Sequence, residues 1–154
     1  MNFKIRKALL GDSDFLFQLR NEESVRLVSL HGDPISLEVH QRWFANKLGN
    51  SNSVIFIAET DGVPIAQTRF DVIGNDAEVS IAVVKEYRGK GYGSEILRKT
   101  SRECFEMFPD LKVINAFINF GNDNSARSFS KAGYSYDRIS ENGGLTRRVM
   151  VIKR

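Results

Sequence analysis

The stretch VVKEYRGKGYGS, residues 83–94, joins a β-rich run to a helical pattern through three alternating glycines. Backbone amides at the start of a helix lack partners within the helix and lie at the positive end of its dipole. Glycine lets such a backbone approach a bulky anion closely, and Arg88 and Lys90 add positive charge. The stretch therefore predicts a phosphate-binding turn at a helix N-terminus, with a plain tight strand-to-helix turn as the alternative.

Two other classes of phosphate-binding loop fit this stretch poorly. The Walker loop closes a longer glycine frame with Lys-Ser or Lys-Thr, whereas Gly93-Ser94 lacks the lysine. The dinucleotide fingerprint has GxGxxG spacing near the start of a parallel fold, whereas these glycines alternate and lie past the midpoint of the chain. A nucleoside triphosphatase and a Rossmann domain are both disfavoured.

The rest of the chain predicts a mixed sheet covered by helices. Period-two or β-rich runs indicate about seven strands, over residues 3–8, 54–59, 65–70, 77–84, 113–117, 134–139 and 146–152. Helical periodicity with capping residues indicates about four helices, over residues 12–28, 36–48, 94–108 and 122–132. Asp61-Gly62 suits a tight hairpin turn between two of the strands. We expect a single α/β (α+β) domain over residues 1–154.

Composition narrows the functional classes. With 42% hydrophobic and 27% charged residues and no long apolar run, the chain is expected to be soluble, without a membrane segment or a signal peptide, and cytoplasmic. Cys104 is the only cysteine and is expected in the core, and His31 and His40 have no metal-binding spacing, so no metal is expected. The net charge of +3 suits an anionic ligand, but Arg147-Arg148 near the C-terminus is too small a basic cluster to predict nucleic-acid binding.

Two motifs resemble those of the GNAT acetyltransferases. Arg88 to Gly93 is similar to the Arg/Gln-x-x-Gly-x-Gly/Ala motif of that family, with a strand before it and a helix after it. Downstream, Asn122 and Ser125, followed by Phe129 and Gly133-Tyr134, resemble the family's Asn-x-x-Ala/Ser helix with its aromatic and Gly-Phe/Tyr positions. The resemblance covers nearly the whole chain and implies a mostly antiparallel sheet, with acetyl-CoA as co-substrate.

The resemblance also implies where the coenzyme binds. The strand before the glycines would splay from its neighbour, and the pantetheine arm would bond the backbone of Ile81, Ala82 and Val83. Asn122 and Ser125 would contact the coenzyme from the downstream helix. The pyrophosphate would be held by Arg88, Gly89, Lys90, Gly91, Tyr92, Gly93 and Ser94.

For the reaction, the resemblance implies direct attack of an amine on the thioester. An alkyl amine needs a base at neutral pH, and Glu78 on the preceding strand is the first candidate, with a solvent-facing charge as the alternative. The Val83 amide would meet the developing oxyanion. Phe129 departs from the family pattern, because many members have a proton-donating tyrosine there. Water or another tyrosine such as Tyr134 would then serve the leaving thiolate, although Tyr134 also suits core packing.

The acceptor is less constrained by the sequence. Segments with Arg20, Arg26, His40 and Trp43 resemble the GNAT branch that acetylates nucleotide-linked amino-sugars, and we expect Arg20, Arg26 and Trp43 to bind the acceptor. Ribosomal-protein alanine acetyltransferases share much of this layout, so protein N-termini and other small amines are alternatives. A CoA-binding module without catalysis is a further alternative. The protein is expected to act as a monomer or homodimer.

Overall fold

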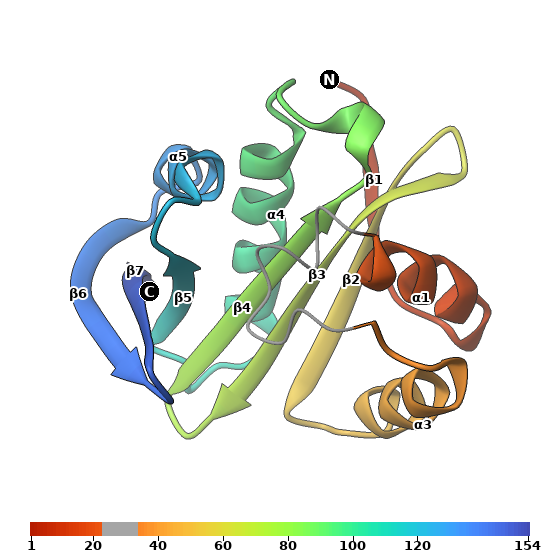
Figure 1. Cartoon of the computed structure of the whole chain (residues 1–154), viewed down its shortest axis with the longest axis horizontal. Coiled ribbons are helices and arrows are strands. Elements are labelled where there is room, and N and C mark those ends of the chain that lie inside the picture. Colours follow the sequence, from red (N-terminus) through yellow and green to blue (C-terminus); the bar gives the residue numbers. More distant parts are fainter. Residues whose placement is uncertain (23–33) are drawn as a thin grey trace.

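The computed structural model describes residues 1–22 and 34–154, which contain a seven-stranded sheet in the order β1-β2-β3-β4-β5-β7-β6 (Figure 1). The strands span Lys4–Lys7 (β1), Ser53–Thr60 (β2), Val63–Ile73 (β3), Asp76–Val83 (β4), Val113–Asn119 (β5), Ser135–Asn142 (β6) and Leu145–Lys153 (β7). The helices span Ser13–Asn21 (α1), Leu37–Leu48 (α3), Tyr92–Met107 (α4) and Asp123–Lys131 (α5). Within these residues β4 and β5 are the one parallel pair, so the predicted mixed, mostly antiparallel sheet with flanking helices is confirmed.

Tight turns set the register of the antiparallel strands. Asp61 and Gly62 have φ angles of 50° and 78°, as the predicted hairpin between β2 and β3 requires. Gly74 has a φ of 63° in the turn between β3 and β4. The register of β3 with β4 then runs without a shift along the whole of β4, so successive β4 side chains alternate strictly between the two faces.

The helix α4 covers one face of the sheet. Its Leu97 and Cys104 are fully buried against sheet residues that include Phe56 and Phe70, which confirms the predicted core position of Cys104. α5 lies beside α4 and adds Phe129 to the same core. This face is therefore closed by packed apolar side chains.

The helices α1 and α3 cover part of the other face, at the β1–β2 end of the sheet (Figure 1). Leu16 of α1 and Phe44 of α3 pack there against Ile55 and Ile57 of β2. Ser36 caps α3 as predicted, because its hydroxyl accepts the Val39 amide at 3.2 Å. A cavity occupies the middle of this face.

The start of α1 differs in detail from the prediction. Asp12 precedes the helix, but its carboxylate accepts two hydrogen bonds from the Arg6 guanidinium, at 2.7 and 2.8 Å, and one from the Leu9 amide at 2.8 Å. It therefore ties β1 to the turn before α1 instead of capping the helix with its side chain. α1 ends at Asn21, because Glu22 has an extended backbone, and the rest of the predicted continuation to Val28 lies outside the described residues.

Across residues 1–22 and 34–154, no helix is both long and apolar enough to span a bilayer.

Candidate functional site

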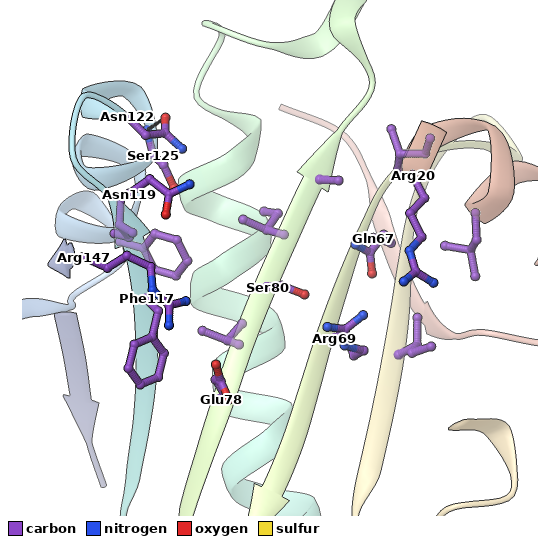
Figure 2. A pocket seen from close by; sticks show the side chains of 18 of the residues that line it. Arg20, Gln67, Arg69, Glu78, Ser80, Phe117, Asn119, Asn122, Ser125 and Arg147 are labelled. Atoms are coloured by element: carbon purple, nitrogen blue, oxygen red, sulfur yellow. Dashed lines mark hydrogen bonds between the residues drawn. The ribbon is translucent and has the colours of Figure 1, made fainter. Parts of the chain in front are cut away.

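A cavity of about 480 Å³ lies on the face of the sheet that α1 and α3 partly cover (Figure 2). It extends from these helices across β3 and β4 to β5, β7 and the start of α5. Several of the residues that the sequence assigned to the coenzyme, the reaction or the acceptor line it, among them Arg20, Trp43, Glu78, Ile81, Ala82, Asn122, Ser125 and Phe129. Segments that are far apart in the chain therefore meet around one space.

The cavity lies beside an opening in the sheet. β4 and β5 pair at three positions, Asp76–Glu78 with Val113–Asn115, and then diverge (Figure 1). Beyond Glu78, β4 continues beside β3 alone, and β5 continues beside β7. The edges of β4 and β5 that face each other thus border a gap, as the resemblance to the GNAT family implied.

The hydrogen-bond pattern of β3 and β4 determines which β4 amides enter this gap. The Val84 amide donates to the Ile65 carbonyl at 2.8 Å, one step beyond the register pair of Ala66 with Val83. Hydrogen-bonded pairs alternate along antiparallel strands, so the amides of Ile81 and Val83 point away from β3. They face the gap, where the pantetheine arm and the oxyanion were expected.

The glycine loop, residues 88–94, follows β4 and runs into the first turn of α4. Gly89 and Gly91 have φ angles of 71° and 86°, a left-handed backbone that favours glycine, and Gly91 is the N-cap of α4. The first amides of this 16-residue helix have no partners within it and lie at the positive end of its dipole. This geometry suits a bound diphosphate.

Two basic side chains belong to the glycine loop. Arg88 donates from Nε to the Val83 carbonyl at 2.8 Å and pairs with Glu22 at 3.1 Å, so it ties the loop to the end of β4 and of α1. The Lys90 side chain is exposed. The loop residues border the cavity region without lining the cavity itself.

Asn122 and Ser125 lie at the start of α5, on the opposite side of the gap from β4 (Figure 2). The Asn122 oxygen Oδ1 accepts the Ser125 amide at 3.3 Å and so caps α5. Since the cap uses the oxygen, the Nδ2 hydrogens are the group of this side chain that would donate to a coenzyme.

Glu78 lines the cavity from β4 (Figure 2). It lies two residues before Ser80 on the same face of the strand, and its register partners on β3 and β5 are Asp71 and Asn115. The unbroken register of β3 with β4 rules out a bulge that would turn Glu78 to the other face. A carboxylate therefore lies on the cavity wall beside the gap.

Tyr134 does not reach the cavity. Its side chain is 2% exposed, and its hydroxyl shares a 2.7 Å hydrogen bond with the Ser101 hydroxyl. Burial raises the pKa of Tyr134 well above its ordinary value. The ring packs edge-on against Phe129, at 5.0 Å between centroids, and Phe129 is the one that lines the cavity. The structure therefore places Tyr134 in the core and not on the cavity wall.

The end of the cavity near α1 and α3 contains an arginine–tryptophan cluster, Arg20, Trp43 and Arg69. The guanidinium carbons of Arg20 and Arg69 lie 4.4 and 5.1 Å from the centroid of the Trp43 ring. The structure thus brings together Arg20 and Trp43, as predicted, while Arg26 lies outside the described residues.

His40 also lines this end of the cavity, but it is fully buried. Its Nε2 lies 3.1 Å from the Ser13 carbonyl, and burial lowers its pKa. A neutral ring that donates to Ser13 holds α3 against the start of α1, which is a structural role.

Two arginines on the cavity wall were missed by the sequence analysis. Arg69 lies opposite Ser80 in the β3–β4 register, and the β3–β4 turn at Gly74 was the available signal for this pairing. Arg147 of β7 is 8% exposed, with its guanidinium carbon 4.9 Å from the centroid of the Phe117 ring. It belongs to the cavity wall, and not to the small surface cluster suggested by its position beside Arg148.

No group of three or more histidine, cysteine, aspartate or glutamate side chains suited to a metal ion occurs among residues 1–22 and 34–154.

Comparisons with known proteins agree with this geometry. Residues 2–135 match the family model of the acetyltransferase (GNAT) domain, whereas a comparison with curated proteins finds no match. The solved structure of AAC(6')-Ib with paromomycin and acetyl-CoA is 18% identical, with a TM-score of 0.86 over 100% of this chain and 94% of that chain. A spermidine N-acetyltransferase chimera of Vibrio cholerae SpeG and hSSAT is 16% identical, with a TM-score of 0.83 over 99% and 96%. A putative phosphinothricin N-acetyltransferase is 22% identical, with a TM-score of 0.82 over 99% and 98%.

Proposed function

The chain belongs to the GNAT acetyltransferase family, and we propose that it transfers an acetyl group from acetyl-CoA to a primary amine by direct attack. The observation that carries this proposal is the divergence of β4 from β5 beyond Glu78, which directs the amides of Ile81 and Val83 into a gap beside the cavity. Backbone donors at such an opening suit an extended chain that carries amide groups, as pantetheine does. The donor supplies the acetyl thioester, and the protein would bind it and orient it toward the amine.

Three parts of the chain would hold the donor. The glycine loop and the start of α4 would bind the diphosphate, the β4 edge at Ile81 and Val83 would bind the pantetheine arm, and Asn122 would donate from Nδ2. Gly91 has the positive φ of a glycine-dependent N-cap and directly precedes the first amides of α4. This fit supports a coenzyme of the CoA type over an isolated phosphate.

Glu78 is our candidate for the base. Its carboxylate lies on the cavity wall in a position to accept an amine proton directly or through water, which leaves the nitrogen lone pair to attack the thioester carbon. As the new C–N bond forms, the Val83 amide would donate to the carbonyl oxygen, where negative charge develops. The carbon–sulfur bond then breaks, the CoA thiolate leaves, and the nitrogen gives its remaining extra proton to solvent to form the amide.

The thiolate would leave without a proton from Phe129 or Tyr134. Phenylalanine has none to give, and the Tyr134 hydroxyl is buried against Ser101. A thiol pKa near 8.5 makes the thiolate an adequate leaving group, so protonation by solvent suffices.

For the acceptor, we propose a nucleotide-linked amino-sugar. Three arginines, at positions 20, 69 and 147, and one carboxylate, Glu78, line the described part of the cavity. Paromomycin and spermidine, named for two structural neighbours, are polycations that such a wall would repel, whereas phosphinothricin is an amine with acidic groups. The charge of the cavity supports an acceptor with acidic groups, and a nucleotide diphosphate supplies them.

The test is release of free CoA from acetyl-CoA over a panel of UDP-amino-sugars, amino acids, peptides and polyamines. We expect turnover with the UDP-amino-sugars and acetylation of the amine in the product, seen by mass spectrometry. Tight CoA binding without turnover on any amine would refute the enzyme proposal. Turnover on peptide N-termini in place of UDP-amino-sugars would refute the acceptor assignment alone.

A further inference from the structure

Arg20 and Arg69 of the arginine–tryptophan cluster lie on the side of β4 away from Asn122, at the other end of the cavity from the expected coenzyme site (Figure 2). We propose that Arg20 and Arg69 bind an oxyanion of the acceptor on the Trp43 platform, and that this subsite selects acidic amines. The inference rests on the proposed function in one respect, that the cavity receives the acceptor.

The charges in the cluster are not balanced within the described part of the chain. Arg69 donates from Nε to Asp71 at 3.1 Å, but the same carboxylate also accepts from Lys47 at 2.6 Å and from the Ser53 hydroxyl at 2.8 Å. Arg20 forms no ion pair there, and its Nη1 is buried without a hydrogen-bond partner. Arg69 and Lys47 thus share the Asp71 carboxylate while Arg20 has no carboxylate partner, and an added anion would neutralise the excess positive charge.

The placement of Arg20 has an energetic cost that such an anion would offset. Burial, and then the nearby Arg69 guanidinium, lower the pKa of Arg20. Two guanidinium groups on one aromatic ring repel each other, although both gain from the ring quadrupole. An oxyanion between them would turn this repulsion into two charge-assisted interactions.

The cluster is also held ready for a ligand. Asp71 anchors Arg69 and is itself fixed by Lys47, while Trp43 supports both guanidinium groups from α3. Guanidinium groups present planar donor pairs that match carboxylate and phosphate oxygens. A pre-arranged site of this kind loses little side-chain freedom when it binds.

The position of the cluster determines how far the bound oxyanion would lie from the reacting amine. Arg69 lies directly opposite Ser80, and Glu78 lies two residues further along the neighbouring strand. Arg69 and Glu78 are thus diagonal neighbours on paired strands, so an amine at Glu78 and an oxyanion at Arg69 would be separated by roughly 7–8 Å. A sugar ring between amine and phosphate spans such a distance, whereas an α-amino acid holds its amine and carboxylate closer together.

Trp43 is the only tryptophan of the chain, so its fluorescence reports on this cluster directly. The full-length protein is first saturated with CoA to occupy the glycine loop, and is then titrated with UDP, inorganic pyrophosphate, L-glutamate or uridine. We expect a saturable change with UDP and pyrophosphate and none with uridine. A response to glutamate without a response to UDP would overturn the assignment of phosphate and assign a carboxylate ligand.

Substitutions in the cluster test whether its arginines bind UDP or only support the fold. Arg20→Gln and Arg69→Gln should each weaken UDP binding by about tenfold or more, as expected for loss of a charge-assisted hydrogen bond. Arg42→Gln is the matched control, because Arg42 lies on the same helix as Trp43, is exposed and pairs with Glu38. It should bind UDP as the unmodified protein does. Circular dichroism checks that each variant is folded. If Arg20→Gln does not fold, the proposal is tested by Arg69→Gln and by the comparison of UDP with uridine.

Either of two binding results would overturn the proposal: no Trp43 response to UDP, pyrophosphate or glutamate, or equal weakening of UDP binding by Arg20→Gln and Arg42→Gln. Equal kcat/KM for a UDP-amino-sugar and the same sugar without its nucleotide would do so as well. Absence of acetyl transfer to any amine, with UDP still bound beside Trp43, would refute the proposed function and support the oxyanion subsite. The two ideas therefore fail in distinguishable ways.

Discussion

Replacement of Gly91 by glutamate tests whether the glycine loop binds the coenzyme diphosphate. Gly91 has a φ of 86°, and a left-handed backbone costs a residue with a side chain about 1–2 kcal/mol. The new Cβ would lie 3.1 Å from the Met1 methyl carbon, the flexible end of a side chain that can move aside. For a domain of this size the strain lowers Tm by roughly 2–8 °C, so the variant should remain folded.

The effect on binding should be larger than the effect on folding. Two unit charges 4 Å apart near a protein surface repel by about 4 kcal/mol, and we halve this to about 2 kcal/mol because the loop is exposed. CoA should therefore bind at least about thirtyfold more weakly, as measured by isothermal titration calorimetry. Pantetheine, which lacks the diphosphate, should bind both proteins equally.

Gly74→Glu is the matched control for this experiment. Gly74 also has a positive φ, 63°, with no neighbouring atom within 4 Å of the point where a Cβ would lie, and it precedes the opposite end of the eight-residue β4. The control adds the same charge and similar strain roughly 26 Å along the strand. Equal CoA affinity in Gly91→Glu and Gly74→Glu, with both proteins folded, would refute the assignment of the glycine loop.

Three further changes test the catalytic and structural roles. Glu78→Gln should lower kcat by about 10²–10⁴ and flatten its pH dependence while the KM for acetyl-CoA is retained; an unchanged pH–rate profile excludes Glu78 as the base. Tyr134→Phe should leave kcat within about threefold but reduce the free energy of unfolding by about 1–3 kcal/mol, because the Ser101 hydroxyl loses its partner; a much slower, fully stable enzyme would return Tyr134 to the mechanism. Arg6 lowers the pKa of Asp12, so the pair should stabilise the fold above the unfolded pKa of about 3.9 and lose that contribution as the pH falls through the folded value. Urea unfolding of Asp12→Asn should thus show a deficit at pH 7 that shrinks in acid, and a deficit independent of pH would contradict this role.

The local backbone features of the proposed donor site were largely predictable from the sequence. Positive φ at Gly89 and Gly91, the N-terminus of α4 and the Asn122 cap all depend on interactions within a few residues of the chain. The same holds for the Asp61-Gly62 hairpin and the Ser36 cap. Such preferences act over one turn or one hairpin, so a single sequence contains enough information to locate them.

The surroundings of the proposed acceptor site depended on contacts between distant segments. Arg69 joins Arg20 and Trp43 only because α1, α3 and β3 pack at the same end of the sheet, and Arg147 enters the cavity wall only because β7 lies beside β5. Tyr134 turned out to be a core residue for the same kind of reason, since its hydroxyl meets Ser101 on α4. Composition and periodicity show that an arginine or tyrosine lies on a strand or beside a helix. Which charges and hydroxyls surround it follows from the order and register of strands far apart in the chain, and these arise only when the whole domain packs.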